Sequence, residues 1–272
     1  MAATARFIGL ALLPVFLAHA APPNSLASAL EYLRDQKSYS WQIINADPGP
    51  VESRFETRRG TITTVQQNVS PNLKGQIDRN GDILISREWA DGLRLDTIIT
   101  KDGAMATKTP EGWLSDRDIL TAQAEERLKG QEPTVRFQWL RRADWPDIHR
   151  PDLELVPFLK SNAEFESTGE GYIARLRSRA GDPAKPNDDD AEPATNITVT
   201  MNLRGGVIRD YEVKIEGTRR TGRSRLSIPV SEQRIVVLTY VPVNRIDIPA
   251  DAREKLNSSR TPGATARGKT DN

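Results

Sequence analysis

The residue types that usually carry catalysis are scarce in this sequence. The chain has two histidines and no cysteine. His19 belongs to an apolar N-terminal stretch, which leaves His149 in a polar segment at residues 147–150. A Ser-His-Asp triad needs a serine held in a supported geometry, and the sequence contains no Gly-x-Ser-x-Gly motif. We therefore predict that the protein is not an enzyme, with no catalytic residues, no cofactor and no metal site.

Two acidic clusters suggest other chemistry, and each has a simpler interpretation. Glu88, next to Trp89 and near Asp91 and Asp96, could serve a glycan-acting enzyme, because glycoside hydrolysis needs two carboxylates. Alternation along a strand sends Glu88 and Trp89 to opposite faces, which weakens this hypothesis. The segment at residues 78–82 is similar to a calcium loop, but its glycine comes early and no closing glutamate follows. A hairpin turn explains these residues better.

Aromatic and methionine side chains are the candidates for binding an apolar ligand. They are spread over several predicted strands, where they could line a hydrophobic cavity or fill the core. The six candidates are Trp41, Trp89, Met105, Trp113, Met201 and Tyr211.

A basic run near the C-terminal end could contact anionic lipid headgroups. Its candidate residues are Arg219, Arg220 and Arg223, which we place in the loop of a hairpin between Gly217 and Arg225. A solvated loop with no specific partner is the simpler interpretation of such a run.

Residues 1–20 have the pattern of a secretory signal peptide. Arg6 precedes an apolar run at residues 7–17, and Ala18-His19-Ala20 provides the small-x-small pattern of a cleavage site. The run is too short to span a bilayer. We expect cleavage after Ala20 and a periplasmic or secreted protein whose core, rather than disulfides, holds it together.

The charge balance argues against nucleic-acid binding. The whole chain has 38 basic and 37 acidic residues, so removal of Arg6 with the signal peptide leaves 37 of each. A protein without net charge lacks the electrostatic attraction that general nucleic-acid binding requires.

The centre of the chain predicts an antiparallel meander at residues 72–113. Asn80-Gly81, Asp91-Gly92 and Asp102-Gly103 supply the glycines that tight hairpin turns need, because glycine tolerates positive φ. Short stretches rich in branched residues lie between these turns, and each is long enough for one strand.

Helices and further strands are predicted on both sides of the meander. Leu26, Ala29, Leu30 and Leu33 share one face of a helix that leads into a strand at residues 39–44. A single polar strand is expected at residues 54–67. Ser115 and Asp118 form a capping-box pattern ahead of Ile119, Leu120, Ala124 and Leu128, and helices also begin near Pro133 and Pro151. We predict that residues 115–160 form a helical insertion that acts as a lid.

Strands resume in the C-terminal half of the chain. They begin near Phe165 and Tyr172, and the clearest alternation of apolar and polar residues runs over residues 196–203. Two last strands are expected at residues 225–230 and 234–241. The loop at residues 179–194, with Asp188-Asp189-Asp190, is predicted to be mobile, and residues 257–272 a disordered tail.

The order of these elements resembles the LolA/LppX-like family of periplasmic lipoprotein and lipid carriers. The resemblance rests on the helix that runs into Ser38-Tyr39-Ser40-Trp41, the Asp102-Gly103 turn before Glu111-Gly112-Trp113, and the closing segment at residues 244–249. It implies an incomplete, strongly curved antiparallel half-barrel with helices over its concave side. It also implies an apolar concavity sized for acyl chains.

The combined prediction is a mainly β fold with some α structure (α+β). Residues 21–256 form one domain: a curved half-barrel sheet of about ten or eleven strands, with helices covering the concave face. The expected function is a monomeric carrier or binding protein that holds the acyl chains of lipids or lipidated proteins. The alternative is a non-enzymatic scaffold of the cell envelope that binds other proteins.

Overall fold

The structure is a computed structural model that describes residues 24–46, 51–57, 60–66, 70–128, 134–143, 149–155, 158, 163–177, 195–220 and 227–259. The predicted signal peptide, the acidic loop at residues 179–194 and residues 260–272 lie outside the described residues.

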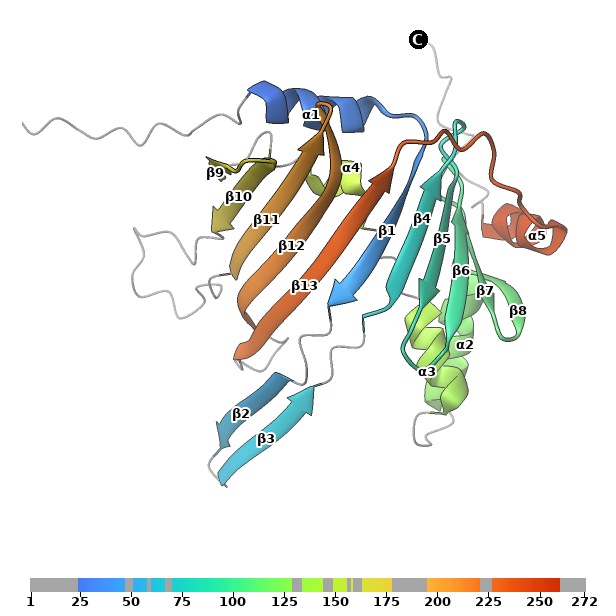
Figure 1. Cartoon of the computed structure of the whole chain (residues 1–272). Helices are drawn as coiled ribbons and strands as arrows, with labels where there is room; N and C mark the ends of the chain where they lie inside the picture. Colours follow the sequence, from blue (N-terminus) through green and yellow to red (C-terminus); the bar gives the residue numbers. More distant parts are fainter. Residues whose placement is uncertain are drawn as a thin grey trace, which may run out of the picture.

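An open sheet of eleven antiparallel strands forms the body of the protein (Figure 1). In sheet order, the strands are β8 (Gly112–Ser115), β7 (Met105–Thr109), β6 (Arg94–Ile99), β5 (Ile83–Glu88), β4 (Asn72–Ile77), β1 (Tyr39–Ala46), β13 (Ser227–Thr239), β12 (Val207–Arg220), β11 (Thr195–Arg204), β10 (Gly171–Arg177) and β9 (Glu164–Ser167). Figure 1 shows the sheet curving from one edge to the other without closing. The prediction of a mainly antiparallel, curved and half-barrel-like open sheet is confirmed.

The central meander folds as predicted. Strands β4 to β8 pair in sequence order, each with the next. Gly81, Gly92 and Gly103 have φ values of 88°, 83° and 87°, in the left-handed region that hairpin turns require. Each of their N–H groups donates to the carbonyl three residues earlier, so the three turns fix the register of this half of the sheet.

Two strand predictions were wrong. Residues 54–67 do not form one strand: β2 (Val51–Thr57) and β3 (Gly60–Gln66) pair as a separate two-stranded ribbon. The chain thus reverses direction within an otherwise strand-like run. Conversely, the two last predicted strands are one long strand, β13, which pairs with β1 and β12.

Alternation along the strands gives the sheet two different faces. We call the face that carries Trp41, Ile43 and Val236 the inner face, and the face that carries Ile44 and Ile235 the outer face. In the register of β1 and β13, Ile43 lies opposite Val236 and Ile44 opposite Ile235. The inner-face residues are buried, whereas Ile44 is 43 % and Ile235 40 % exposed.

Four helices in the described part of the chain cover the inner face. Helices α1 (Asn24–Asp35) and α4 (Pro151–Leu155) share one core cluster with β1 and β10 to β13. Helices α2 (Asp116–Leu128) and α3 (Val135–Ala143) form a second cluster with Trp89 and Leu95 at the other end of the sheet. None of the described helices is long and apolar enough to cross a membrane.

A fifth helix, α5 (Ala250–Ser259), packs on the outer face. Ala252 and Leu256 of α5 are buried against Ile98 and Ala106 near the β7–β8 edge of the sheet (Figure 1). This helix was not predicted; it extends to Ser259 and so enters the segment that was predicted to be a disordered tail.

The capping box of α2 is confirmed, but its predicted buried face was wrong. The Asp118 N–H donates to Ser115 Oγ, and the Ser115 N–H donates to Asp118 Oδ2, both at 3.1 Å. Leu120 and Leu128, predicted to face the core, are 55 % and 87 % exposed. Buried positions instead follow Ile119 at spacings of three and four residues, and they include polar side chains held by hydrogen bonds: Ala122, Gln123 and Glu126.

Candidate functional site

A buried polar cluster lies between α4 and the inner face of the sheet. We call it the α4 latch and define it by Tyr39, Asp152, Glu154, Tyr211 and Arg234. Helix α4 supplies the two carboxylates, strands β1 and β12 the two tyrosines, and β13 the arginine. Alternation places all three strand residues on the inner face, directly under the short helix.

Two tyrosines bind the helix to the sheet. Tyr39 Oη donates to Asp152 Oδ1, and Tyr211 Oη donates to Glu154 Oε2, each at 2.7 Å. Tyr39 and Tyr211 are completely buried. These hydrogen bonds join residues more than fifty positions apart in sequence, so the latch forms only when the sheet is complete.

Two arginines balance the carboxylate charges of the latch. Arg234 forms ion pairs with Glu154 of α4 and with Glu232 of its own strand. Arg150, which directly precedes α4, pairs with Asp152 at 2.6 Å. The Arg234 side chain is only 5 % exposed, and its Nε has no hydrogen-bond partner among the described residues.

Burial and the neighbouring charges fix the protonation states of the two tyrosines and of Arg234 in the latch. Burial raises the pKa of Tyr211 well above its usual value, and the Glu154 charge raises it further. Burial and then the Asp152 charge raise the pKa of Tyr39 in the same way. Burial alone would lower the pKa of Arg234, but Glu154 and Glu232 together outweigh it and the pKa rises. The cluster therefore presents neutral hydroxyl donors and a cationic guanidinium to a carboxylate.

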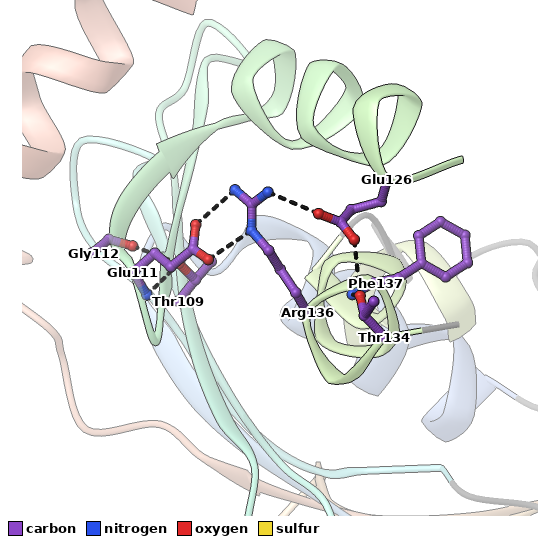
Figure 2. A network of polar contacts seen from close by, with 7 residues as sticks. All are labelled: Thr109, Glu111, Gly112, Glu126, Thr134, Arg136 and Phe137. Atoms are coloured by element: carbon purple, nitrogen blue, oxygen red, sulfur yellow. Dashed lines mark hydrogen bonds and ion pairs between the residues drawn. The ribbon is translucent and has the colours of Figure 1, made fainter. Parts of the chain in front are cut away.

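A second polar network ties α2 and α3 to the turn between β7 and β8 (Figure 2). Arg136 of α3 binds Glu111 through two parallel contacts, Nε to Oε1 at 2.6 Å and Nη2 to Oε2 at 2.8 Å. Its Nη1 donates to Glu126 Oε1 of α2 at 3.1 Å. Thr134 Oγ1 accepts the Phe137 N–H at 3.0 Å and donates to Glu126 Oε2 at 2.9 Å. This network joins three elements and acts as a structural clamp.

Three of the six predicted ligand-lining residues come together on the inner face. Trp41, Met201 and Tyr211 belong to the same buried cluster, under α1 and α4. The Trp41 ring lies directly over Gly75 of the neighbouring strand, and its Nε1 is buried without a partner in the described structure. Tyr211 belongs to the α4 latch.

The other three lie elsewhere on the sheet. Trp89 packs with α2 and α3, where the guanidinium carbons of Arg87 and Arg142 lie 5.8 and 5.4 Å from the centre of its ring. Met105 is partly buried on β7, opposite Ile99 of β6. Trp113 is on the outer face, in the cluster that α5 covers.

The predicted basic loop is partly strand. Arg219 and Arg220 are the last residues of β12 and pair with Ile228 and Ser227 of β13, so the strand continues past Gly217, where the loop was predicted. Arg223 lies outside the described residues.

The residues considered for catalysis lie on the outer face of the sheet or in the segment before α4. Glu88 is exposed, and the adjoining Trp89 is buried, as alternation predicts. Asp96 lies near Arg94 on the outer face, with Oδ1 and Nε 3.3 Å apart. His149 has a φ of 39°, which is uncommon outside glycine, at the residue before Arg150. In the part of the chain that the structure describes, no three His, Asp or Glu side chains are grouped to hold a metal.

Residues 78–82, which are similar to a calcium loop, form a hairpin turn, as predicted, and have an additional role. Asp78 is completely buried. Its Oδ1 accepts the N–H groups of Asn80 and Asp82 at 2.8 and 3.1 Å, and its Oδ2 accepts the Ile246 N–H at 3.0 Å. One carboxylate thus shapes a turn and anchors the segment that leads to α5.

Sequence reasoning missed the α4 latch. Its residues are spread over four elements, and only pairing of β1 with β13 and of β13 with β12 brings them together. One local signal existed: Asp152 and Glu154 alternate with apolar residues in a helix too short to bury much surface.

A scan against protein-family models matches no family, and a search of curated proteins finds none with significant similarity to the chain. The geometry of the site is therefore the basis on which its function is inferred.

Proposed function

We propose that this protein binds the acyl chains of lipids or lipidated proteins between the inner face of its sheet and helices α1 and α4. The observation that carries the proposal is the way the inner face is covered. An apolar, curved and open sheet is closed by separate short helices rather than by a second sheet, so one helix can move without unfolding the sheet.

Helix α4 is the cover best suited to move. It has five residues, of which Pro151 and Leu155 are buried. It also packs against α1, and the polar contacts of the α4 latch, which a ligand can replace, attach it to the sheet. Helix α1, by contrast, buries Leu26, Ala29 and Leu30 completely.

The energetics allow an acyl chain to displace α4. Exposing Leu155 costs roughly 1.5–3 kcal/mol, and each buried methylene of a ligand contributes about 0.8 kcal/mol. Each hydrogen bond of the latch to a charged group contributes about 1.5–3 kcal/mol, which is lost when α4 moves away. With Leu155 exposed and the three contacts of α4 to Tyr39, Tyr211 and Arg234 lost, the cost is roughly 6–12 kcal/mol, which a chain that buries about 8 to 15 methylenes offsets.

Native mass spectrometry, before and after organic extraction, tests whether lipids purify with the protein. Tryptophan quenching by a brominated fatty acid then locates the bound chain, because bromine quenches only rings that it touches. The chain contains five tryptophans, so single Trp→Phe variants separate their signals.

Quenching is expected to fall strongly in Trp41→Phe, on the inner face, and to persist in Trp113→Phe, on the outer face. The reverse pattern, or a protein that carries no lipid and shows no quenching, would refute the proposal.

A second candidate function, a scaffold that binds another protein, has one observation in its favour. Ile44, Ile235 and Val237 form an exposed apolar patch on the outer face of adjoining strands. Exposed apolar patches mark interaction surfaces in many proteins. Loss of a co-purifying protein in Ile235→Lys, with lipid binding unchanged, would favour this function.

A further inference from the structure

The buried charges of the α4 latch select among possible ligands. Arg234 is nearly inaccessible and is neutralised by Glu154 of α4 and Glu232 of β13. Any ligand that moves α4 takes Glu154 away from Arg234. Arg234 then keeps its ion pair with Glu232 through Nη1, but its Nη2 and the Tyr211 hydroxyl lose their acceptor. Buried donors left without an acceptor are destabilising, because they are out of contact with water.

We propose that the ligand replaces the lost partner: a carboxylate headgroup, as in a long-chain fatty acid, binds Arg234 and Tyr211 in the position that Glu154 occupies in the closed structure. This inference rests on the proposed acyl-binding function and adds the chemical class of the ligand. In the closed structure, the Glu154 carboxylate thus occupies the headgroup-binding position.

The geometry of the latch fits a carboxylate. Glu154 uses both of its oxygens, Oε2 for the Tyr211 hydroxyl and Oε1 for Arg234. A carboxylate offers the same two acceptor atoms in one plane, and a guanidinium binds them in a fork. The unpartnered Nε of Arg234 supplies one more donor than the closed structure uses among its described residues.

The position of the latch also fits an amphiphile. Tyr211 shares the buried cluster with Met201, Val199 and Val213, on the same face of the sheet. A headgroup held at Arg234 would place its alkyl chain against these side chains. A neutral headgroup would gain the same apolar contacts but would leave Arg234 without its second carboxylate.

The two contributions can be measured separately with chain-matched probes. Oleic acid and oleyl alcohol have the same hydrocarbon tail, so the ratio of their affinities reports the headgroup alone. Charge-assisted hydrogen bonds predict that the acid binds roughly tenfold to hundredfold more tightly than the alcohol. Affinities are measured by fluorescence competition at a pH where the free acid is ionised.

Two variants test whether the preference for the acid over the alcohol comes from the α4 latch. Arg234→Met keeps an apolar stem of similar length and should reduce the acid-to-alcohol ratio to about one. Glu154→Gln weakens the closed state without changing the open one, so it should raise both affinities by the same factor and preserve the ratio. Circular dichroism checks that each variant is folded.

A double variant, Arg234→Met with Glu154→Gln, removes both buried charges and keeps the test valid if Arg234→Met alone does not fold. Arg175→Met is the matched control, because it removes an exposed arginine of β10 that pairs with Glu166, and it should leave the ratio unchanged.

The possible results separate the two proposals. Equal binding of acid and alcohol would overturn the headgroup inference and leave acyl binding intact. Binding of neither probe would overturn both. An acid preference that survives Arg234→Met, or that disappears in Arg175→Met, would overturn the assignment to Arg234.

Discussion

The contact between Trp41 and Gly75 offers the most direct test of the inner-face packing. Alanine at position 75 would place its Cβ 2.2 Å from Cε2 and Cζ2 of Trp41 and 2.6 Å from Cη2. Carbon atoms in contact normally lie about 3.5–4.0 Å apart. The indole ring would therefore have to retreat by more than about 1 Å, inside a core where it is 3 % exposed.

Gly75→Ala should destabilise the protein by about 1–3 kcal/mol, the usual cost of overpacking a core. The lower entropy of the unfolded alanine chain offsets only about 0.4–1 kcal/mol. In urea unfolding followed by circular dichroism, the midpoint should fall by roughly 0.5–1.5 M. Gly169→Ala is the matched control, because its Cβ would meet no atom within 4 Å and its stability should not fall.

A double-mutant cycle identifies Trp41 as the cause. Trp41→Leu removes the ring that the new Cβ would meet, so Gly75→Ala should cost close to nothing in that background. If Gly75→Ala costs the same in the Trp41→Leu background as in the wild-type protein, or costs nothing in the wild-type protein, the described packing of Trp41 over Gly75 is wrong.

Three further predictions concern local structure. Burial opposes the charge of Asp118, but hydrogen bonds from Ser115 and Lys255 outweigh burial and lower the pKa of this carboxyl group. Because its pKa is lower in the folded than in the unfolded protein, the Asp118 carboxylate stabilises the fold at neutral pH, and this contribution is lost as the pH falls below about 4. Asp118→Ala should thus cost about 1 kcal/mol at neutral pH and much less in acid, as measured by urea unfolding. Asp78→Ala removes a buried acceptor and should cost at least about 1–3 kcal/mol, with faster amide exchange at Ile246; unchanged exchange there would contradict the anchor. At position 149, where φ is 39°, valine should be less stable than glycine by about 1–2 kcal/mol, and equal thermal stabilities of the two variants would contradict the left-handed backbone.

Features set by neighbouring residues could be predicted from the sequence. The Asn-Gly and Asp-Gly turns place three hairpins correctly, because positive φ is a local requirement that only few residues satisfy. The capping box of Ser115 and the apolar stripe of α1 are likewise short-range patterns.

Features set by long-range contacts could not be predicted. Helix α2 buries the face that carries Glu126, which binds Arg136, and exposes the apolar residues Leu120 and Leu128. Helix α5 has only Ala252 and Leu256 as buried positions, so its amphipathic signal is weak. The α4 latch depends on the pairing of strands from opposite ends of the chain, and residue spacing does not reveal it.

The different attachments of α4 and α2 lead to a last prediction. The Glu154 N–H donates to the Arg150 carbonyl at 2.9 Å, so its exchange with solvent reports the opening of α4. Helix α2 is held by the clamp at Arg136 and by buried Ile119 and Gln123. If α4 opens on its own to admit an acyl chain, the Glu154 amide must exchange through a local opening of lower free energy than the amides of α2.

Native-state hydrogen exchange at increasing urea concentration distinguishes local opening of α4 from opening by global unfolding. Exchange at Glu154 should depend weakly on urea, because opening a five-residue helix exposes little surface. Exchange in the core of α2 should follow global unfolding. Equal protection and equal urea dependence at both places would mean that α4 opens only when the whole protein unfolds. An acyl chain would then have no route to the inner face through α4, and the carrier function would have to be abandoned in favour of a scaffold that acts through the outer face.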